Sequence, residues 1–221
     1  TRTGTLFPYT TLFRSMSNKN HLLRPTLAMS PVIPVLVIDR TEDAIPIAQA
    51  LVDGGLRILE ITLRTTNALD VIRDISRHVP QAIVAAGTVT TPKQWHAAAQ
   101  AGAQFVVSPG LTPHLASEAA NAPVPLLPGV ATASELMIAM DSGFECFKFF
   151  PAQQAGGTGM LKAWHGPFAD AVFCPTGGIT IETAPQFLSL PNVACVGGSW
   201  LAPAQLVQAQ NWSQLRALAS E

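Results

Sequence analysis

The sequence predicts an α/β fold, a single (β/α)8 TIM barrel. Eight short apolar runs alternate along the chain with eight segments of helical pattern. The runs are continuously apolar, which is typical of parallel strands that are covered on both faces. Eight such units in about 200 residues match the small end of the range for these barrels. A doubly wound open sheet, the alternative, usually has fewer units and a glycine-rich turn after its first strand, where VIDRTED has no glycine.

Each apolar run is an expected strand that is bounded by turn residues. In chain order the runs are VIPVLVI (32–38), RILEITL (57–63), AIVAAG (82–87), FVVSP (105–109), PLLPG (125–129), FECFKFF (144–150), VFCPTG (172–177) and VACVGG (193–198). Helices are expected at 41–55, 65–79, 91–103, 112–122, 132–143, 157–166 and 180–190, and after Pro203. Several of them begin at threonine, the expected N-cap, and several end at glycine, namely Gly54, Gly102 and Gly143.

We interpret residues 16–221 as one barrel domain and residues 1–15 as a non-native N-terminal extension. The segment TRTGTLFPYTTLFRS contains the only tyrosine of the chain, and no strand or helix pattern continues from it into the body. It also lacks the apolar stretch and the small-residue cleavage site of a signal peptide. Met16 is therefore the expected native start.

Composition limits the function classes. Charged residues make up 12% of the chain, and the formal net charge is −1, so the basic stripe of a nucleic-acid-binding protein is missing. No apolar run reaches the roughly 18 residues that a membrane span requires. The three cysteines, Cys146, Cys174 and Cys195, lie in apolar runs without a CxxC pair. We therefore expect no nucleic-acid partner, no membrane span, and buried free thiols rather than disulfides.

A lysine lies inside the aromatic run FECFKFF. Side chains alternate along a strand, so Cys146, Lys148 and Phe150 share one face, and Phe147 and Phe149 point outward to the helices. Lysine is seldom buried without a reason, and burial disfavours its charged form. A neutral amine condenses with a ketone to a Schiff base, whose iminium accepts the electrons of a breaking carbon–carbon bond. The structural alternative is a lysine that reaches solvent or pairs with Glu60.

The second expected strand ends in the charged segment EITLR. Glu60, Thr62 and Arg64 share one face of this strand, and Glu60 and Arg64 pairing with each other is the structural alternative. The second and sixth strands contribute to the same layers of a barrel interior, so we expect Glu60 to meet Lys148. A carboxylate beside the amine can transfer the protons that imine chemistry requires. Its charge also favours the ammonium form, and the sequence leaves open which effect dominates.

Paired glycines follow the last two expected strands. Gly177–Gly178 in PTGGIT and Gly197–Gly198 in VGGSW let the backbone approach an anion closely, and Ser199 adds a hydroxyl. The loops in these two places commonly hold a phosphate in barrel enzymes, although tight turns also use glycine routinely. Thr88, which follows the third expected strand in AAGTVT, lies at the rim or else caps the next helix. Together these features indicate a phosphorylated substrate that reacts through a lysine imine.

Seven segments, in this order and spacing, resemble one enzyme family: EITLRT, AAGTVT, SPGLTP, PGVATASE, FKFFPA, CPTGG and GGSW. They are similar to those of the 2-keto-3-deoxy-6-phosphogluconate (KDPG) aldolase and 4-hydroxy-2-oxoglutarate aldolase family, and the resemblance runs from about Pro31 to Pro203. It implies a class I aldolase without metal or other cofactor, which cleaves KDPG to pyruvate and glyceraldehyde 3-phosphate. It also implies a cytoplasmic homotrimer, cleavage of 4-hydroxy-2-oxoglutarate and decarboxylation of oxaloacetate. The segment LRT favours the gluconate enzyme over related phosphogalactonate aldolases.

The resemblance also implies roles for individual residues. Lys148 would form the Schiff base, and Glu60 would be the general acid and base. Arg64 and Thr88 would bind the pyruvate carboxylate. The rest of the implied pocket consists of Pro109 and Phe150 as lining, and of Thr176, Gly177, Gly178, Gly198 and Ser199 at the phosphate.

Three other function classes are compatible with parts of this pattern. A metal-dependent aldolase would need clustered His, Asp or Glu ligands at strand ends, whereas the five histidines lie in expected helices or the N-terminal tail. A sugar-phosphate isomerase would share the glycine loops but would not need Lys148 for covalent chemistry. A non-catalytic phosphate-binding barrel would bind its ligand without Lys148. The stereochemical preference and the physiological 2-keto acid are not predicted.

Overall fold

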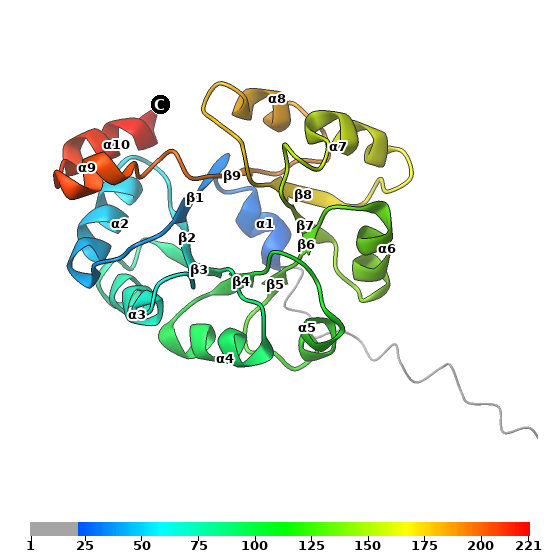
Figure 1. Cartoon of the computed structure of the whole chain (residues 1–221), viewed down its shortest axis with the longest axis horizontal. Helices are drawn as coiled ribbons and strands as arrows, with labels where there is room; N and C mark the ends of the chain where they lie inside the picture. Colours follow the sequence, from blue (N-terminus) through cyan, green and yellow to red (C-terminus); the bar gives the residue numbers. More distant parts are fainter. Residues whose placement is uncertain (1–21) are drawn as a thin grey trace, which may run out of the picture.

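A computed structural model describes residues 22–221, so the predictions for residues 1–15 and for Met16 lie outside the described residues. The fold is α/β, with parallel strands at the centre and helices around them (Figure 1). A curled six-stranded sheet has the order β5-β4-β3-β2-β1-β9, and a three-stranded sheet has the order β6-β7-β8. Isolated parallel bridges, Phe173 to Val193 and Thr176 to Gly197, join the two sheets between β8 and β9.

All eight predicted strand regions contain strands. The strands are β1 (Val32–Leu36), β2 (Ile58–Thr62), β3 (Ile83–Gly87), β4 (Phe105–Val107), β5 (Leu126–Leu127), β6 (Gly129–Val130), β7 (Cys146–Phe149), β8 (Val172–Pro175) and β9 (Val196–Gly198). The fifth predicted strand is divided at Pro128, which has no N–H to donate to a neighbouring strand. As a result β5 pairs with β4, and β6 pairs with β7. The predicted eight-stranded ring is thus observed in part, as two sheets.

The predicted helical regions also contain helices. The helices are α1 (Leu23–Leu27), α2 (Ala44–Asp53), α3 (Ala68–His78), α4 (Pro92–Ala101), α5 (Pro113–Glu118), α6 (Ala133–Asp141), α7 (Gly157–His165), α8 (Ala184–Leu188), α9 (Ala204–Gln208) and α10 (Trp212–Ser220), with a 3-10 turn, η3 (Thr41–Asp43), before α2. The sequence did not predict α1, and the region after Pro203 forms two helices. Among residues 22–221 no helix is both long and apolar enough to cross a membrane.

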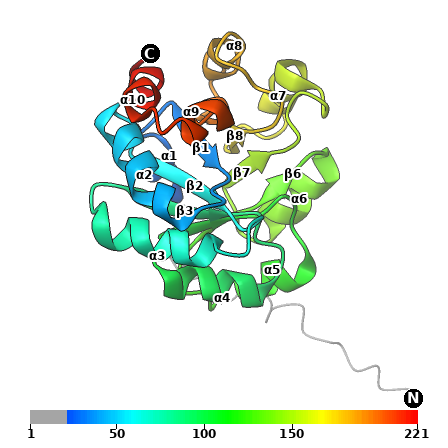
Figure 2. The same cartoon turned by 60° about the vertical axis from the view of Figure 1, so that its left-hand side comes forward.

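The expected caps are present at several helix ends. Thr91, Thr112 and Thr132 each accept a hydrogen bond from a backbone N–H in the first turn of α4, α5 and α6. Gly102 ends α4 with a left-handed φ of 111°. Gly54 ends α2 and also makes space for α10, because a Cβ there would lie 2.8 Å from the backbone oxygen of Arg216. Figure 2 shows α10 beside α2 on the outside of the molecule. At α6 the capping residue is Ser142, and Gly143 follows it.

Two layers of apolar side chains cover the two faces of the strands, as side-chain alternation predicts. The outer layer includes Phe149, whose ring centroid lies 5.3 Å from that of Trp164 in α7. The inner layer consists of Leu23, Leu27, Ile33, Ile58, Ala85, Phe105, Val107, Leu127, Cys146, Val172, Cys174 and Cys195. Most of its strand residues lie near the N-terminal ends of their strands, so α1, which supplies Leu23 and Leu27, covers that end. The three cysteines are free and buried, as expected.

Candidate active site

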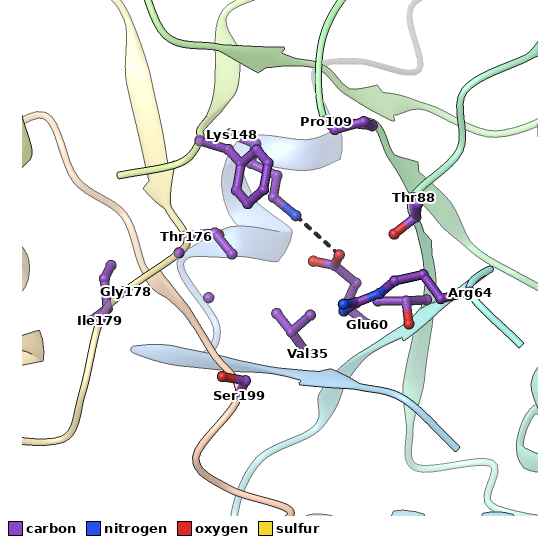
Figure 3. A pocket seen from close by; sticks show the side chains of 14 residues that line it. Val35, Glu60, Arg64, Thr88, Pro109, Lys148, Thr176, Gly178, Ile179 and Ser199 are labelled. Carbon is purple, nitrogen blue, oxygen red and sulfur yellow. Dashed lines mark hydrogen bonds and ion pairs between the residues drawn. The ribbon is translucent and has the colours of Figure 1, made fainter. Parts of the chain in front are cut away.

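A cavity of about 330 Å³ opens at the C-terminal ends of the strands (Figure 3). Its walls come from β1, β2, β3, β4, β7, β8 and β9 or from the loops directly after them. The lining residues are Val35, Glu60, Thr62, Arg64, Thr88, Pro109, Lys148, Phe150, Thr176, Gly177, Gly178, Ile179, Gly197 and Ser199. Because this end of parallel strands is where α/β barrels carry their chemistry, the cavity is the candidate active site.

Lys148 and Glu60 form a buried pair at the centre of this cavity. Nζ of Lys148 donates a hydrogen bond of 3.1 Å to Oε1 of Glu60, drawn as a dashed line in Figure 3. The two residues are only 6% and 4% exposed. Within residues 22–221, Glu60 forms its ion pair with Lys148, and none with Arg64 is observed. The two expected strands therefore do bring the amine and the carboxylate together, and Lys148 does not reach bulk solvent.

Aromatic side chains shape the surroundings of the amine. Nζ of Lys148 lies 5.3 Å from the ring centroid of Phe150, which comes two residues later, directly after β7. Phe147 and Phe149 are fully buried in the outer layer, against the helices. The strand thus exposes its one charged side chain to the cavity and buries its neighbours, as the alternation predicted.

Arg64 and Thr88 line the side of the cavity near Glu60 (Figure 3). Thr88 has a left-handed φ of 61°, which is rare for a β-branched residue, and such strained conformations cluster at functional sites. Thr91, and not Thr88, caps the following helix α4. The structural alternative for Thr88 is therefore wrong, and its side chain is available to the cavity.

The glycine turns lie at the opposite side of the cavity. Gly177 and Gly178 have left-handed φ angles of 102° and 74°, a conformation that glycine adopts without steric cost. In the other pair Gly197 lines the cavity and the predicted Gly198 does not. Alternation along β9 explains the difference, since a Cβ on Gly198 would point at the ring of Trp200. Thr176 and Ser199 complete this side.

Three further lining residues were not among the predicted site residues. Val35 is the parallel-strand neighbour of Glu60, and its position two residues after the inward-facing Ile33 could have revealed it. Thr62 donates a hydrogen bond of 2.9 Å to the backbone oxygen of Leu36, so its hydroxyl ties β2 to β1. Ile179 follows the glycine turn, and no pattern in the sequence marks it.

The buried thiols are poor candidates for the reacting group. Burial raises the pKa of the Cys146 thiol to about 11. The pKa of Cys195 is well above its ordinary value, because of its hydrogen bond with Cys174 and because of burial. Thiolate is the nucleophilic form of cysteine, so both thiols are unreactive at neutral pH. Within residues 22–221, no three His, Cys, Asp or Glu side chains group closely enough to hold a metal ion.

Comparison with known families and proteins agrees with this arrangement. The family model described as KDPG and KHG aldolase matches residues 23–218. The chain belongs to this family. The 2-dehydro-3-deoxy-phosphogluconate aldolase of Dickeya dadantii is 49% identical over 206 residues, which are 93% of this chain and 97% of that protein. The KHG/KDPG aldolase of Escherichia coli K12 is 48% identical over the same shares of the two chains. Membership confirms the predicted family and enzyme class, a lyase.

Solved structures of KDPG aldolases have the same fold. The enzyme of Legionella pneumophila, with pyruvate captured at low pH as a covalent carbinolamine intermediate, has a TM-score of 0.87 and 47% identity, over 89% of this chain and 96% of that one. The enzyme of Zymomonas mobilis ZM4 with 3-phosphoglycerate has a TM-score of 0.83 and 47% identity, over 89% and 94% of the two chains. Both comparisons cover most of the α/β domain described above.

Proposed function

We propose that this chain is a class I aldolase that cleaves KDPG to pyruvate and glyceraldehyde 3-phosphate through an imine on Lys148. The observation that carries the proposal is the buried hydrogen bond of 3.1 Å between Lys148 and Glu60 inside the cavity. A nucleophile in contact with a group that can accept its proton is the arrangement that covalent catalysis requires. The names of the similar enzymes supply the substrate.

The first half of the reaction makes the imine. Transfer of a proton from Nζ of Lys148 to Glu60 gives a neutral amine, whose lone pair attacks the keto carbon of the substrate. The oxygen of the adduct takes this proton back from Glu60 to give the carbinolamine. Glu60 then passes a second proton from the nitrogen to the oxygen, which leaves as water and generates the iminium. Glu60 acts here first as a base and then as an acid.

The second half breaks and repairs the carbon skeleton. Glu60 removes the proton of the hydroxyl on the fourth carbon of the substrate, and the bond between the third and fourth carbons breaks. Its electron pair moves to the iminium to form an enamine, and glyceraldehyde 3-phosphate leaves as the aldehyde. Glu60 then protonates the enamine carbon, and addition of water releases pyruvate and restores the amine. We assign the proton transfers to Glu60 because it is the acidic residue in the lining.

The two ends of the substrate fit the two sides of the cavity. Arg64 supplies a cation and Thr88 a hydroxyl for the carboxylate beside the reacting carbon. Gly177, Gly178 and Ser199 bind the phosphate with backbone N–H groups and a hydroxyl. Gly198 is outside the lining, so we assign it no contact with the phosphate. The remaining assigned residues form the wall between the two ends, namely Pro109, Phe150 and Thr176.

The finer predictions on architecture and assembly belong to the same proposal. We infer one (β/α)8 barrel, supported by the bridges between β8 and β9 and by the single residue, Pro128, between β5 and β6. The homotrimer and the cytoplasmic location are supported by the family resemblance alone. Sedimentation equilibrium tests the trimer, and a single monomeric species at working concentration would contradict it.

Trapping with borohydride tests the imine directly. Incubation with pyruvate and sodium borohydride, followed by peptide mass spectrometry, should place a reduced adduct on Lys148. Lys162→Ala, which removes an exposed lysine of α7, is the matched control and should be labelled like the wild type. An enzyme that cleaves KDPG while Lys148 stays unlabelled would contradict the proposal. Ligand binding without any cleavage, retained in Lys148→Ala, would favour a non-catalytic barrel.

Cleavage of 4-hydroxy-2-oxoglutarate is a second candidate activity of the same site. The matching family model carries both substrates in its description, and the Escherichia coli relative is named for both. The amine, Glu60 and the carboxylate side of the cavity would act alike on either substrate. The two substrates differ beyond the fourth carbon, where 4-hydroxy-2-oxoglutarate has a carboxylate and KDPG has a phosphorylated two-carbon unit. A comparison of kcat/KM for the two substrates decides which one the site prefers.

A further inference from the structure

Gly87, the last residue of β3, lies directly against the carboxylate of Glu60. A Cβ on residue 87 would be 2.8 Å from both Cγ and Cδ of Glu60 and nearer still to Oε1, whereas real Cβ contacts essentially never fall below 3.0 Å. The φ angle of Gly87 is outside the left-handed region, so the backbone conformation does not require glycine there. The lack of a side chain at residue 87 therefore matters because it leaves space for the carboxylate of Glu60.

That space is occupied by the carboxylate that contacts Lys148. Glu60 is buried, and within the described part of the chain its side chain makes one hydrogen bond, the 3.1 Å contact from Nζ of Lys148. The position of the Glu60 carboxylate thus depends on the hydrogen bond from Lys148 on one side and on packing against Gly87 on the other. Gly87 itself is held in register, because it pairs with Thr62 of β2 and its carbonyl accepts from the N–H of Leu63 at 2.8 Å.

We propose that Gly87 is a positioning residue for Glu60 in the reaction. It has no side chain, so the carboxylate can lie close to the backbone of β3 and within reach of Nζ of Lys148. A methyl group at residue 87 would force Oε1 to move, and the proton transfers between Glu60 and the bound intermediate would slow. A displacement of about 1 Å in a catalytic group can cost on the order of 10²-fold in rate. This inference rests on the proposed function.

The test compares Gly87→Ala with Gly110→Ala. A Cβ on Gly110 would meet no atom within 4 Å, and its φ is also outside the left-handed region, which makes it a matched control near the same cavity. We measure KDPG cleavage and the exchange of pyruvate methyl protons for deuterium, which needs the imine on Lys148 and the acid and base but no aldehyde. Gly87→Ala should lower kcat and the exchange rate about 10- to 100-fold with a smaller change in KM. Gly110→Ala should stay near the wild type.

A double-mutant cycle separates positioning from a general structural effect. If Gly87 acts through Glu60, adding Gly87→Ala to Glu60→Ala should cause little further loss of exchange, because the displaced group is already absent. An equal fold-loss in both backgrounds, or wild-type exchange in Gly87→Ala, would overturn the proposal. If Gly87→Ala alone fails to fold, the double variant should fold and have the melting temperature of Glu60→Ala. A double variant that also fails to fold would contradict the proposed role of Gly87.

Borohydride labelling of the wild type distinguishes this inference from the proposed function. If Lys148 is labelled but the losses of exchange rate in Gly87→Ala and Glu60→Ala are additive in the double variant, the role of Gly87 is wrong and the imine on Lys148 still holds. Absence of label on Lys148 in an active wild-type enzyme would defeat the proposed function itself.

Discussion

Replacement of Glu60 by glutamine should isolate proton transfer from packing. The amide has nearly the shape of the carboxylate, so it still fits against Gly87, and its Oε1 can still accept the 3.1 Å hydrogen bond from Lys148. Only the negative charge and the ability to bind a proton are lost. General acid–base catalysis contributes about 10²- to 10⁴-fold, so we expect turnover to fall by that factor. At about 1.36 kcal/mol per factor of ten, the barrier rises by roughly 2.7 to 5.4 kcal/mol.

Stability should change less than turnover in this variant. Removing one partner of a buried ion pair typically costs about 3–5 kcal/mol, because a charge is left unpaired away from water. The pair lines a cavity that opens to solvent, so we expect the cost to lie below about 3 kcal/mol. Urea denaturation of Glu60→Gln and of the wild type measures this difference, and it ensures that a lost rate does not reflect unfolded protein.

The assay follows deuterium uptake into the methyl group of pyruvate by NMR, beside steady-state cleavage of KDPG. Glu118→Gln is the matched control, because Oε1 of Glu118 also contacts a nitrogen side chain, with Nε2 of His96 at 2.8 Å, but Glu118 lies outside the cavity. The control should keep the wild-type rate. If folded Glu60→Gln exchanges protons within a factor of about three of the wild type, below the range for acid–base catalysis, Glu60 is not the acid and base.

Three further predictions follow from the same structure. Ser199→Ala removes one hydrogen bond to a charged group, worth about 1.5–3 kcal/mol, so KM for KDPG should rise roughly 10- to 100-fold while exchange into pyruvate stays intact; a loss of exchange would place Ser199 in the chemistry instead. Leu27→Ala opens a cavity beneath the inner layer and should lower the free energy of unfolding by about 2–5 kcal/mol in urea titrations, and an unchanged midpoint would show that α1 does not stabilise the fold. The folded Cys146 thiol keeps its proton up to about pH 11, and its ordinary pKa is 9.0, so its contribution to stability is present below pH 9 and is lost as the pH rises towards 11. Iodoacetamide at pH 8 should accordingly label this cysteine only in denaturant, and rapid labelling of native protein would contradict its burial.

The parts of the fold and site that depend on local pattern could be predicted from the sequence. Strand alternation separated Lys148 from its aromatic neighbours, and barrel layering placed it opposite Glu60. The same two rules located the amine, the carboxylate and the glycine turns at one end of the strands. Each rule uses the period of a strand or the order of strands, which a single sequence does contain.

The features that were missed depend on tertiary contacts. Helix α1 has only five residues, and Leu23 and Leu27 are stabilised by the inner layer rather than by a helical pattern of their own. The division of the fifth strand is an exception, because Pro128 and its missing N–H are visible in the sequence within the run PLLPG. Gly197 lines the cavity and Gly198 does not, because neighbouring residues of β9 face opposite sides of the sheet. The sequence did not fix which of the two glycines faces the cavity.

The contact between Lys148 and Glu60 joins positions that are 88 apart in the chain. Recovery of turnover after dilution from urea therefore reports on the completed molecule, because neither half of the chain contains both groups. In a refolding time course, the circular dichroism signal of the helices could recover before the catalytic activity. That delay would mark an interval in which the helices exist but the strands that carry Glu60 and Lys148 are not yet in contact. The enzyme thus carries its own probe of long-range assembly, and no added label is needed to read it.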